Sequence, residues 1–307
     1  MHAFKKCLPW IRWVLIFGMS AGCHTGPRIP AETPTSGMIH ISVDESFKPV
    51  IDSQLKVFES SFPNARILVE YKSEAACLRD LSNDSTRLVI ITRGLSLAEE
   101  SFFKDSAKNP AISGILAYDA VAMIVNNKSR DTLMDMSDVA DLLEGKDKKQ
   151  REAVMDGVSA TSTVRFCLDS VLKGKTLGKN VIAARSSPQV ISYVENHPQA
   201  IGFIGVSWIG DNEDSTDLAF LKQVKVVAVR CERCSDKPYV WPNQYNIYYK
   251  RYPMVRGLYY ILKENFSGVG NNFINFLVNE RGQLIFKRAY LMPGRMNFEI
   301  RNVQMEQ

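Results

Sequence analysis

The sequence predicts an α/β fold made of two lobes, and three observations lead to this expectation. Segments of β-type composition alternate with segments of helical apolar periodicity, which is typical of a sheet covered by helices on both faces. Residues 112–127 keep β-type composition over more positions than a strand usually needs, so this segment can cross from one lobe to the other. A second series of strands and helices follows it. Apolar residues make up 45% of the chain, which is enough for two adjoining cores.

Three strand-and-helix units are expected before the long segment. The helix after the first strand has an apolar stripe that begins at Phe47, with Pro49 in its first turn. Ser73 is the expected N-cap of the second helix. Ser96 and Glu99 have the spacing of a capping box at the start of the third. The expected strands are 38–43, 66–71 and 87–92.

The second lobe is expected to follow the same rhythm. One helix should begin at Ser137 and end at Gly145, and another should begin at Ser187 with Pro188 in its first turn. The expected strands are 181–184, 200–205, 224–229 and 244–249, and the expected C-terminal helical stripes cover 255–262 and 273–277. The expected lobes are 38–118 together with 250–307, and 119–249.

Residues 1–22 have the pattern of a secretion signal. A basic start precedes an apolar run that is too short to span a bilayer. The small residues directly before Cys23 resemble a bacterial lipobox, in which the cysteine is acylated and becomes the mature N-terminus. The alternative is a plain cleaved signal with an incidental cysteine. Residues 23–37 are rich in Pro, Thr and Gly, so we expect a flexible tether and a periplasmic protein anchored to a membrane by lipid.

The charge of the mature chain is close to balanced. Removal of residues 1–22 takes away three of the 38 Lys and Arg residues and none of the 33 Asp and Glu residues, which leaves 35 against 33. A near-neutral surface gives no reason to expect nucleic acid as the partner.

The cysteines favour a disulfide over a metal site. Cys231 and Cys234 are close enough in sequence for a local disulfide across a loop, whereas Cys77 and Cys167 are expected to be small buried apolar groups. A zinc site would need two further ligands beside the Cys pair, and the body of the chain holds few histidines. We expect no metal and no cofactor.

Four segments in order along the chain resemble one protein family. They read AYDAVAMIVNN, SYVENHPQAIGFIGVSWI, YPMVRGLYYIL and FINFLVNERGQLIFKRAYLMPG. Together they resemble the phosphate-binding proteins of bacterial ABC importers, which are type II periplasmic solute-binding proteins. The last segment is similar to the C-terminal motif of that family, with Ala289 in place of the usual glycine.

The resemblance implies a Venus-flytrap fold, with two α/β lobes joined by two crossover strands. It also implies that inorganic phosphate binds in the cleft between the lobes and is delivered to ABC permease subunits. We expect the protein to be a monomer that binds reversibly and catalyses no reaction.

A cluster of hydroxyl residues at an expected helix start is the strongest candidate for the anion site. Backbone N–H groups at a helix start attract anions, and hydroxyl side chains add rotatable donors. A nearby arginine can add charge-assisted contacts. The cluster comprises Ser159, Thr161, Ser162, Thr163 and Arg165.

Three other loops should converge on the same cleft, because ligands of α/β sheets sit beyond the carboxyl ends of the strands. Their candidate phosphate-binding residues are Ser46, Ser73, Thr92 and Arg93. The family has an aspartate that accepts the proton of hydrogen phosphate and discriminates against sulfate, and here Asp44, Glu45 or Glu74 could take that role.

Simpler explanations exist for several of these residues. A serine at a helix start is more often an ordinary cap, which applies to Ser73 but does not account for a whole hydroxyl cluster. Arg93 and Arg165 could equally form surface ion pairs. The aromatic residues between Trp241 and Tyr252 could stack on a sugar, but aromatics on a strand more often pack within a sheet.

Three classes of function follow from these observations. The first is a transport receptor for phosphate. The second is a lipoprotein that keeps the fold with a changed or lost ligand, in a scaffold or signalling role. The third is a secreted hydrolase, which is disfavoured because the sequence has no G-x-S-x-G or H-E-x-x-H motif.

Overall fold

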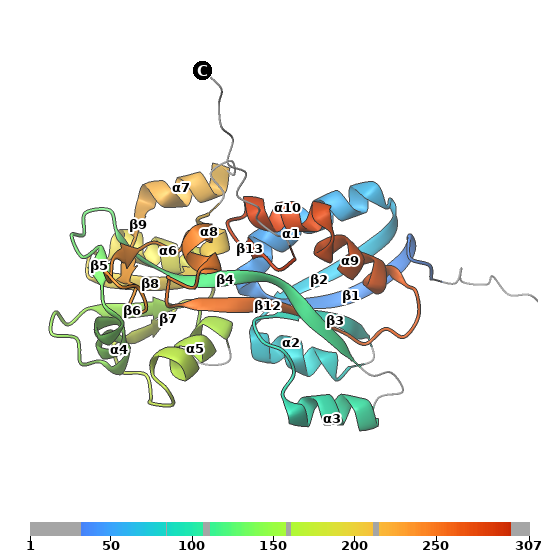
Figure 1. Cartoon of the computed structure of the whole chain (residues 1–307), viewed down its shortest axis with the longest axis horizontal. Helices are drawn as coiled ribbons and strands as arrows, with labels where there is room; N and C mark the ends of the chain where they lie inside the picture. The colour runs from blue at the N-terminus through green and yellow to red at the C-terminus, as the bar shows by residue number, and fades with distance from the viewer. Residues whose placement is uncertain (1–31, 84, 107–110, 158–160, 211–214, 296–307) are drawn as a thin grey trace, which may run out of the picture. The chain divides into compact units, whose positions relative to one another are not determined.

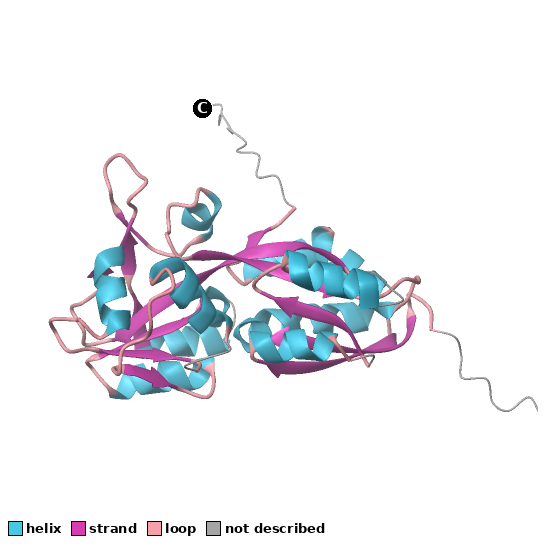
Figure 2. Ribbon diagram, turned by 90° about the horizontal axis from the view of Figure 1, so that it is seen from below, coloured by secondary structure: helices cyan, strands magenta, loops and turns pink. Residues whose placement is uncertain are grey.

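The long strand β4, Ile112–Asn126, runs through a ten-stranded sheet in the computed structural model of the chain. The structure describes residues 32–83, 85–106, 111–157, 161–210 and 215–295. The first part of β4 pairs with β12, Val255–Leu262, and its second part pairs with β8, Ala200–Gly205. Figures 1 and 2 show β4 and β12 passing between two groups of strands and helices. The expected two-lobed α/β fold with two crossover strands is confirmed.

The first lobe is a parallel sheet with helices on both faces. The strands β1, Ser36–Asp44, β2, Asn64–Lys72, and β3, Thr86–Ile91, are parallel, and β12 pairs antiparallel with β3. Figure 1 shows α1, α9 and α10 on one face and α2 and α3 on the other. These helices are α1, Lys48–Ser61, α2, Glu74–Leu81, α3, Leu97–Ser106, α9, Val269–Val278, and α10, Glu280–Arg288.

Local signals predicted this lobe well. All three expected strands are present, Pro49 lies in the first turn of α1, and Ser96 and Glu99 exchange both hydrogen bonds of a capping box. A short strand β13, Met292–Pro293, follows α10 and pairs with β4. Gln283 on α10 donates to the carbonyls of Leu116 and Leu277, so the C-terminal motif residue holds α10 against β4.

The second lobe combines the other end of the large sheet with a small sheet. In the large sheet β8 pairs with β6, Glu152–Met155, which pairs with β7, Val181–Ala183, and β9, Val224–Val226, pairs with β4. The small sheet holds β5, Leu133–Met134, β10, Ala228–Arg230, and β11, Tyr239–Val240. The helices are α4, Met136–Glu144, α5, Ser162–Phe166, α6, Ser187–Asn196, α7, Ser215–Gln223, and α8, Gln244–Tyr248.

Three sequence-based assignments are corrected by the structure. Residues 244–249 were expected to form a strand, but they form α8, which begins after Asn243 because that side chain accepts a hydrogen bond from the Asn246 N–H at 2.9 Å. The apolar spacing over 255–262 suggested a helix, but this segment is β12, buried between β3 and β4. The expected strand 224–229 is divided into β9 and β10, because the chain passes from the large sheet to the small one.

The expected signal over 1–22 and Cys23 lie outside the described residues. The last part of the expected tether is attached to the body: Ser36 opens β1, and the Glu32 carboxylate accepts hydrogen bonds from Arg87 and from the Val269 N–H. Cys231 and Cys234 form the expected disulfide, and the expected burial of Cys77 and Cys167 is confirmed. Within the described ranges, no helix combines the length and apolarity needed to cross a bilayer.

Replacement of Phe58 by alanine tests the core of the first lobe. The Phe58 ring is fully buried and contacts the rings of Phe62, Phe273 and Phe276. Phe58→Ala should lower the free energy of unfolding in urea by about 3–5 kcal/mol through loss of these contacts and formation of a cavity. Phe102→Ala, at a ring that is 53% exposed, is the matched control and should change it little. Equal losses in the two variants would contradict this account of the core.

Candidate functional site

A buried ion pair joins the two crossover strands. Arg256 on β12 lies opposite Asp119 on β4, and the Arg256 Nε donates to Asp119 Oδ2 at 2.8 Å. The two side chains are 2% and 0% exposed. Asp119 Oδ1 also accepts from the Val206 N–H at 3.2 Å. Burial of charges is costly, so we consider Arg256 a candidate binding residue.

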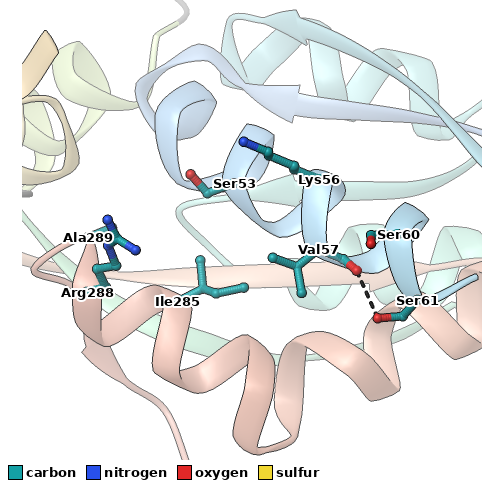
Figure 3. A pocket seen from close by; sticks show the side chains of 8 residues that line it. All are labelled: Ser53, Lys56, Val57, Ser60, Ser61, Ile285, Arg288 and Ala289. Carbon is teal, nitrogen blue, oxygen red and sulfur yellow. Dashed lines mark hydrogen bonds between the residues drawn. The ribbon is translucent and has the colours of Figure 1, made fainter. Parts of the chain in front are cut away.

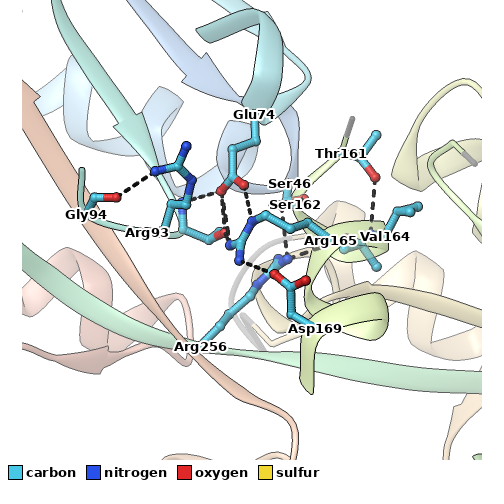
Figure 4. Close-up of polar contacts among 12 residues, drawn as sticks. Ser46, Glu74, Arg93, Gly94, Thr161, Ser162, Val164, Arg165, Asp169 and Arg256 are labelled. Carbon is cyan, nitrogen blue, oxygen red and sulfur yellow. Dashed lines mark hydrogen bonds and ion pairs between the residues drawn. The ribbon is translucent and has the colours of Figure 1, made fainter. Parts of the chain in front are cut away.

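One terminal nitrogen of Arg256 contacts hydroxyl residues at the beginning of α5. Arg256 Nη1 donates to Ser162 Oγ at 3.0 Å and to Thr163 Oγ1 at 3.5 Å. Ser162 Oγ lies 3.4 Å from Ser46 Oγ, which comes from the loop after β1 (Figure 4). Within the described part of the chain, Arg256 Nη2 is buried and has no hydrogen-bond partner. The two N–H groups of Nη2 on this buried cation are therefore available to a ligand.

A small cavity lies at the carboxyl ends of two pairs of parallel strands, one pair from each lobe. Its volume is about 160 Å³, and its walls follow β1, β2, β6 and β7. This is the edge at which ligands of α/β sheets bind. The lining residues are Asp44, Glu45, Tyr71, Lys72, Ser73, Asp156, Thr161 and Arg185.

Three carboxyl groups make this cavity unusual for an anion site. Burial raises the pKa of Asp44 to about 6 and that of Glu45 to about 7, and it also raises the pKa of Asp156. Asp44 Oδ1 accepts from the Ser46 N–H at 2.9 Å. Asp44 Oδ2 and Asp156 Oδ1 are buried without a hydrogen-bond partner among the described residues. When its carboxyl group is ionised, each of these oxygens can accept a hydrogen bond from a ligand. When the oxygen is protonated, it can donate one.

Glu45 links two loops that border the cavity. Its carboxylate oxygens accept from the Ser187 N–H at 3.2 Å and from Ser187 Oγ at 3.1 Å, at the beginning of α6. Ser207 Oγ donates to the Ser46 carbonyl at 3.0 Å. The loop after β1 is thus tied to the second lobe at two points. Gly205 lies at the same junction, where an added Cβ would be 3.2 Å from Arg256 Nη2 and 3.3 Å from the Ser46 oxygen.

A second polar network joins α2, β3 and α5 (Figure 4). Glu74 accepts from the Thr92 N–H at 3.0 Å and from Thr92 Oγ1, and Arg165 Nε donates to its other oxygen. Arg165 Nη2 donates to Thr92 Oγ1 at 2.8 Å. Burial opposes ionisation of Glu74, but the bonds from Arg165 and Thr92 outweigh it and hold the pKa of Glu74 below its usual value. Arg165 is therefore neutralised by a partner 91 residues away in sequence.

The structure places most of the predicted site residues in three neighbouring groups. Ser46, Ser162 and Thr163 lie around Arg256, and Ser73 and Thr161 line the cavity. Thr92 and Arg165 belong to the Glu74 network, which α5 places beside the first group.

Arg93 is not part of these groups. Arg93 forms a two-pronged ion pair with Glu99, with both N–O distances 2.7 Å, and Ser159 lies outside the described residues. Thr161 caps α5 by accepting from the Val164 N–H at 3.3 Å, whereas Ser73 precedes α2 without a side-chain cap bond. The cap explanation therefore fits Thr161 better than Ser73.

Three residues of the site were not predicted from the sequence, namely Arg256, Asp119 and Asp156. Arg256 and Asp119 are single charges within apolar strand segments, which is a signal of a buried functional charge. Asp156 directly follows β6, at the edge where ligand residues were sought.

A larger cavity elsewhere lacks these features. It has a volume of about 520 Å³ and lies between the outer sides of α1 and α10 (Figure 3). Its walls are Ser53, Lys56, Val57, Ser60, Ser61, Ile285, Arg288 and Ala289. The small cavity is the better candidate because only it adjoins the unpartnered buried groups of Asp44 and Asp156. In the part of the chain that is described, no group of three or more His, Cys, Asp or Glu residues is arranged to hold a metal ion.

Comparisons with known proteins agree on the fold. A family model described as a PBP superfamily domain matches residues 29–281. A protein assigned as a phosphate ABC transporter substrate-binding protein from Clostridium perfringens, solved with bound phosphate, superposes with a TM-score of 0.70 at 20% identity, covering 84% of this chain and 100% of its own.

Two further solved structures are similar. A phosphate transport receptor of the ABC type from Vibrio cholerae has a TM-score of 0.60 at 17% identity and covers 83% of this chain and 99% of its own. A substrate-binding domain assigned to a molybdenum ABC transporter from Clostridium difficile has a TM-score of 0.50 at 14% identity, with coverage of 83% and 98%. No curated protein was found to match the sequence.

Removal of the buried cation tests its role in the structure. Arg256→Met leaves the Asp119 carboxylate buried without its partner and should lower the free energy of unfolding by about 3–5 kcal/mol. Adding Asp119→Asn to this variant should restore much of the loss, because the remaining side chain is neutral. Urea unfolding of Arg256→Met, of Asp119→Asn and of the double variant measures the effect. Additive losses in the double variant would show that the two charges do not act as a pair.

The carboxyl groups at the cavity predict a dependence of stability on pH. Their pKa values are higher in the folded protein than the ordinary 3.8 and 4.5, so the folded state binds more protons and stability falls as pH rises through about 6 to 7. Asp44→Asn should remove roughly 1–3 kcal/mol of the difference in free energy of unfolding between pH 5 and pH 8. Asp236→Asn, at an exposed position, should retain the wild-type dependence. A wild-type profile in Asp44→Asn would contradict the role of Asp44.

Proposed function

This chain belongs to the PBP superfamily, and from that premise we propose that it is an extracytoplasmic receptor that binds inorganic phosphate between its lobes and delivers it to an ABC importer. The observation that carries the proposal is the set of three unpartnered buried groups: Arg256 Nη2, Asp44 Oδ2 and Asp156 Oδ1. A ligand that presents both acceptor oxygens and O–H donors would satisfy all three. Partly protonated phosphate has this combination, and sulfate at neutral pH lacks the donors.

The hydroxyl residues complete the proposed site. Ser46, Ser162 and Thr163 can turn their O–H groups toward an oxyanion, because a serine or threonine hydroxyl rotates to suit its acceptor. They lie within hydrogen-bond distance of one another or of Arg256, so one small ion can contact several of them. Such neutral donors bind an anion while keeping it releasable to a transporter.

The acidic residues set the charge state in which the ion binds. Ionised carboxylates at Asp44, Glu45 and Asp156 would repel an anion, but burial favours their neutral forms. Binding is therefore expected to be coupled to the protons on the ion and on these groups. In this proposal the lobes close on the ion and reopen to release it, without a chemical step.

A second candidate function is the receptor for a different solute. Three carboxyl groups line the cavity, and one of them, Asp156, shortly precedes the hydroxyl cluster in sequence. This arrangement favours a ligand with several proton donors. The similarity to a domain assigned to molybdenum transport also shows that the fold is used by receptors other than those for phosphate.

The location of the protein is part of the proposal. We propose that residues 1–22 act as a signal and that Cys23 carries the lipid that holds the body at a membrane, with permease subunits as partners and a monomeric receptor. Mass spectrometry of the protein from a bacterial membrane fraction tests the anchor. An N-terminal Cys23 carrying acyl chains supports it, and cleavage at another residue contradicts it.

Titration calorimetry with phosphate and sulfate tests the ligand. Phosphate should bind at least about 100-fold more tightly than sulfate at pH 7, where Asp44 is mostly ionised, because its unpaired oxygen then needs a hydrogen bond that sulfate has no proton to donate. Its affinity should fall as pH rises further toward 8, because Glu45 then becomes ionised as well.

Single-site variants locate the binding. Ser162→Ala should weaken phosphate by roughly 3- to 10-fold through the loss of one hydroxyl donor. Ser53→Ala, at an exposed position on α1, is the matched control and should bind as the wild type does. The absence of heat with phosphate, together with heat for another solute, would replace the proposal with the second candidate.

A further inference from the structure

Aromatic side chains form an exposed surface around α8. Trp241, Tyr245, Tyr248 and Tyr249 are 55%, 57%, 48% and 49% exposed. The ring centroids of Tyr245 and Tyr249 are 4.8 Å apart, and so are those of Tyr248 and Tyr249, so these rings form one continuous surface. Single exposed apolar residues are common, but a contiguous group of this kind marks an interaction site.

Basic residues border this surface. Arg251 lies over the ring of Tyr245, with its guanidinium carbon 5.5 Å from the ring centroid, and Lys250 directly precedes it in sequence. We call the group of Trp241, Tyr245, Tyr248, Tyr249, Lys250 and Arg251 the aromatic-basic surface.

A cavity of about 280 Å³ adjoins the aromatic-basic surface and shares Tyr248 and Lys250 with it. Arg295 supplies a second cation, and none of the lining residues is acidic. The other lining residues are Tyr118, Ile247, Val255, Met292, Pro293 and Gly294. The cavity is therefore suited to a phosphate group that belongs to a larger molecule lying across the aromatic rings.

The two chain segments that line most of this cavity carry no acidic residue. The sequence has no Asp or Glu from Lys237 to Lys263 and none from Arg281 to Arg295, and these two segments supply most of the cavity wall. They are held together because Gln244 Nε2 donates to the carbonyls of Lys287 at 2.5 Å and Leu291 at 2.9 Å. A basic surface attracts a negatively charged partner.

We propose that the aromatic-basic surface binds the headgroup region of an anionic phospholipid bilayer. Trp and Tyr prefer the membrane interface, where an apolar ring meets lipid and its polar end meets water. Lys250, Arg251 and Arg295 face the negative headgroups, and the cavity receives one lipid phosphate between Lys250 and Arg295. The cations beside the rings, together with a cavity that no acidic residue lines, favour a layer of negative headgroups over a protein partner. This contact orients the receptor on the membrane independently of any lipid on Cys23.

Vesicle binding tests the inference with the full chain carrying Cys23→Ser, so that no lipid can be attached there. Binding to vesicles of phosphatidylcholine mixed with phosphatidylglycerol should exceed binding to phosphatidylcholine alone. The excess should fall at least about tenfold in Lys250→Glu/Arg251→Glu and in Trp241→Ser/Tyr249→Ser, because charge attraction and ring insertion both contribute. Lipids with a quencher at headgroup depth should reduce the fluorescence that Trp241 contributes.

Phe102→Ser/Lys104→Glu on α3 is the matched control, since it removes an exposed ring and a base at another site and should keep the excess. Thermal unfolding of each variant verifies that the fold is intact. The inference is overturned if anionic lipid gives no excess binding, if the α8 variants keep the excess, or if the α3 control loses it to the same extent. Salt-insensitive binding to neutral vesicles that depends on the four rings alone would also overturn it.

Discussion

The buried pair of Arg256 and Asp119 is the interaction on which the rest of the site depends. It joins β12 to β4 next to the point where β4 leaves β12 and begins to pair with β8. Both charges are held away from water, so their mutual attraction has to offset a large desolvation cost. The pair fixes the guanidinium, and the guanidinium in turn holds Ser162 and Thr163 at the beginning of α5. The same ion pair thus links the two crossover strands to each other and to the hydroxyl residues of the site.

The balance of charge around Arg256 explains the character of the cavity. Asp119 already takes the closest ion-pair contact, so Asp44 and Asp156 lie near a cation that is largely neutralised. Their pKa values rise because burial outweighs the attraction to Arg256. Glu74 has the opposite outcome, since Arg165 and Thr92 bind it directly and stabilise its ionised form. Neighbouring carboxyl groups therefore divide into acids with a raised pKa at the cavity and one with a lowered pKa in a closed network.

The parts of the fold that depend on local sequence could be predicted. The β1, β2 and β3 strands, the capping box at Ser96 and the helix stop at Gly145 follow from signals within a few residues. The α8 and β12 assignments failed for a physical reason. The aromatic residues in 244–249 have strand propensity, but the cap at Asn243 stabilises a short helix there. The segment 255–262 forms the strand β12 because it pairs with β3 on one side and with β4 on the other.

The site shows the same division between local and distant information. The hydroxyl residues could be found because they cluster at one helix start, and all of them that the structure describes lie near Arg256 or the cavity. The partners of Arg165 and Arg256 could not be found, because Glu74 and Asp119 are 91 and 137 residues away from them in sequence. Ion pairs of this kind depend on the folded topology, which no local pattern of residues contains.

Gly205 places a steric limit on how the two halves of this fold meet. An added Cβ would already be within 3.2–3.4 Å of Arg256 Nη2, the Ser46 oxygen and Asp119 Oδ2. Any side chain with atoms beyond Cβ would therefore clash with these groups at the end of β8. A larger residue at position 205 would therefore require the loop after β1, the guanidinium or the Asp119 carboxylate to shift.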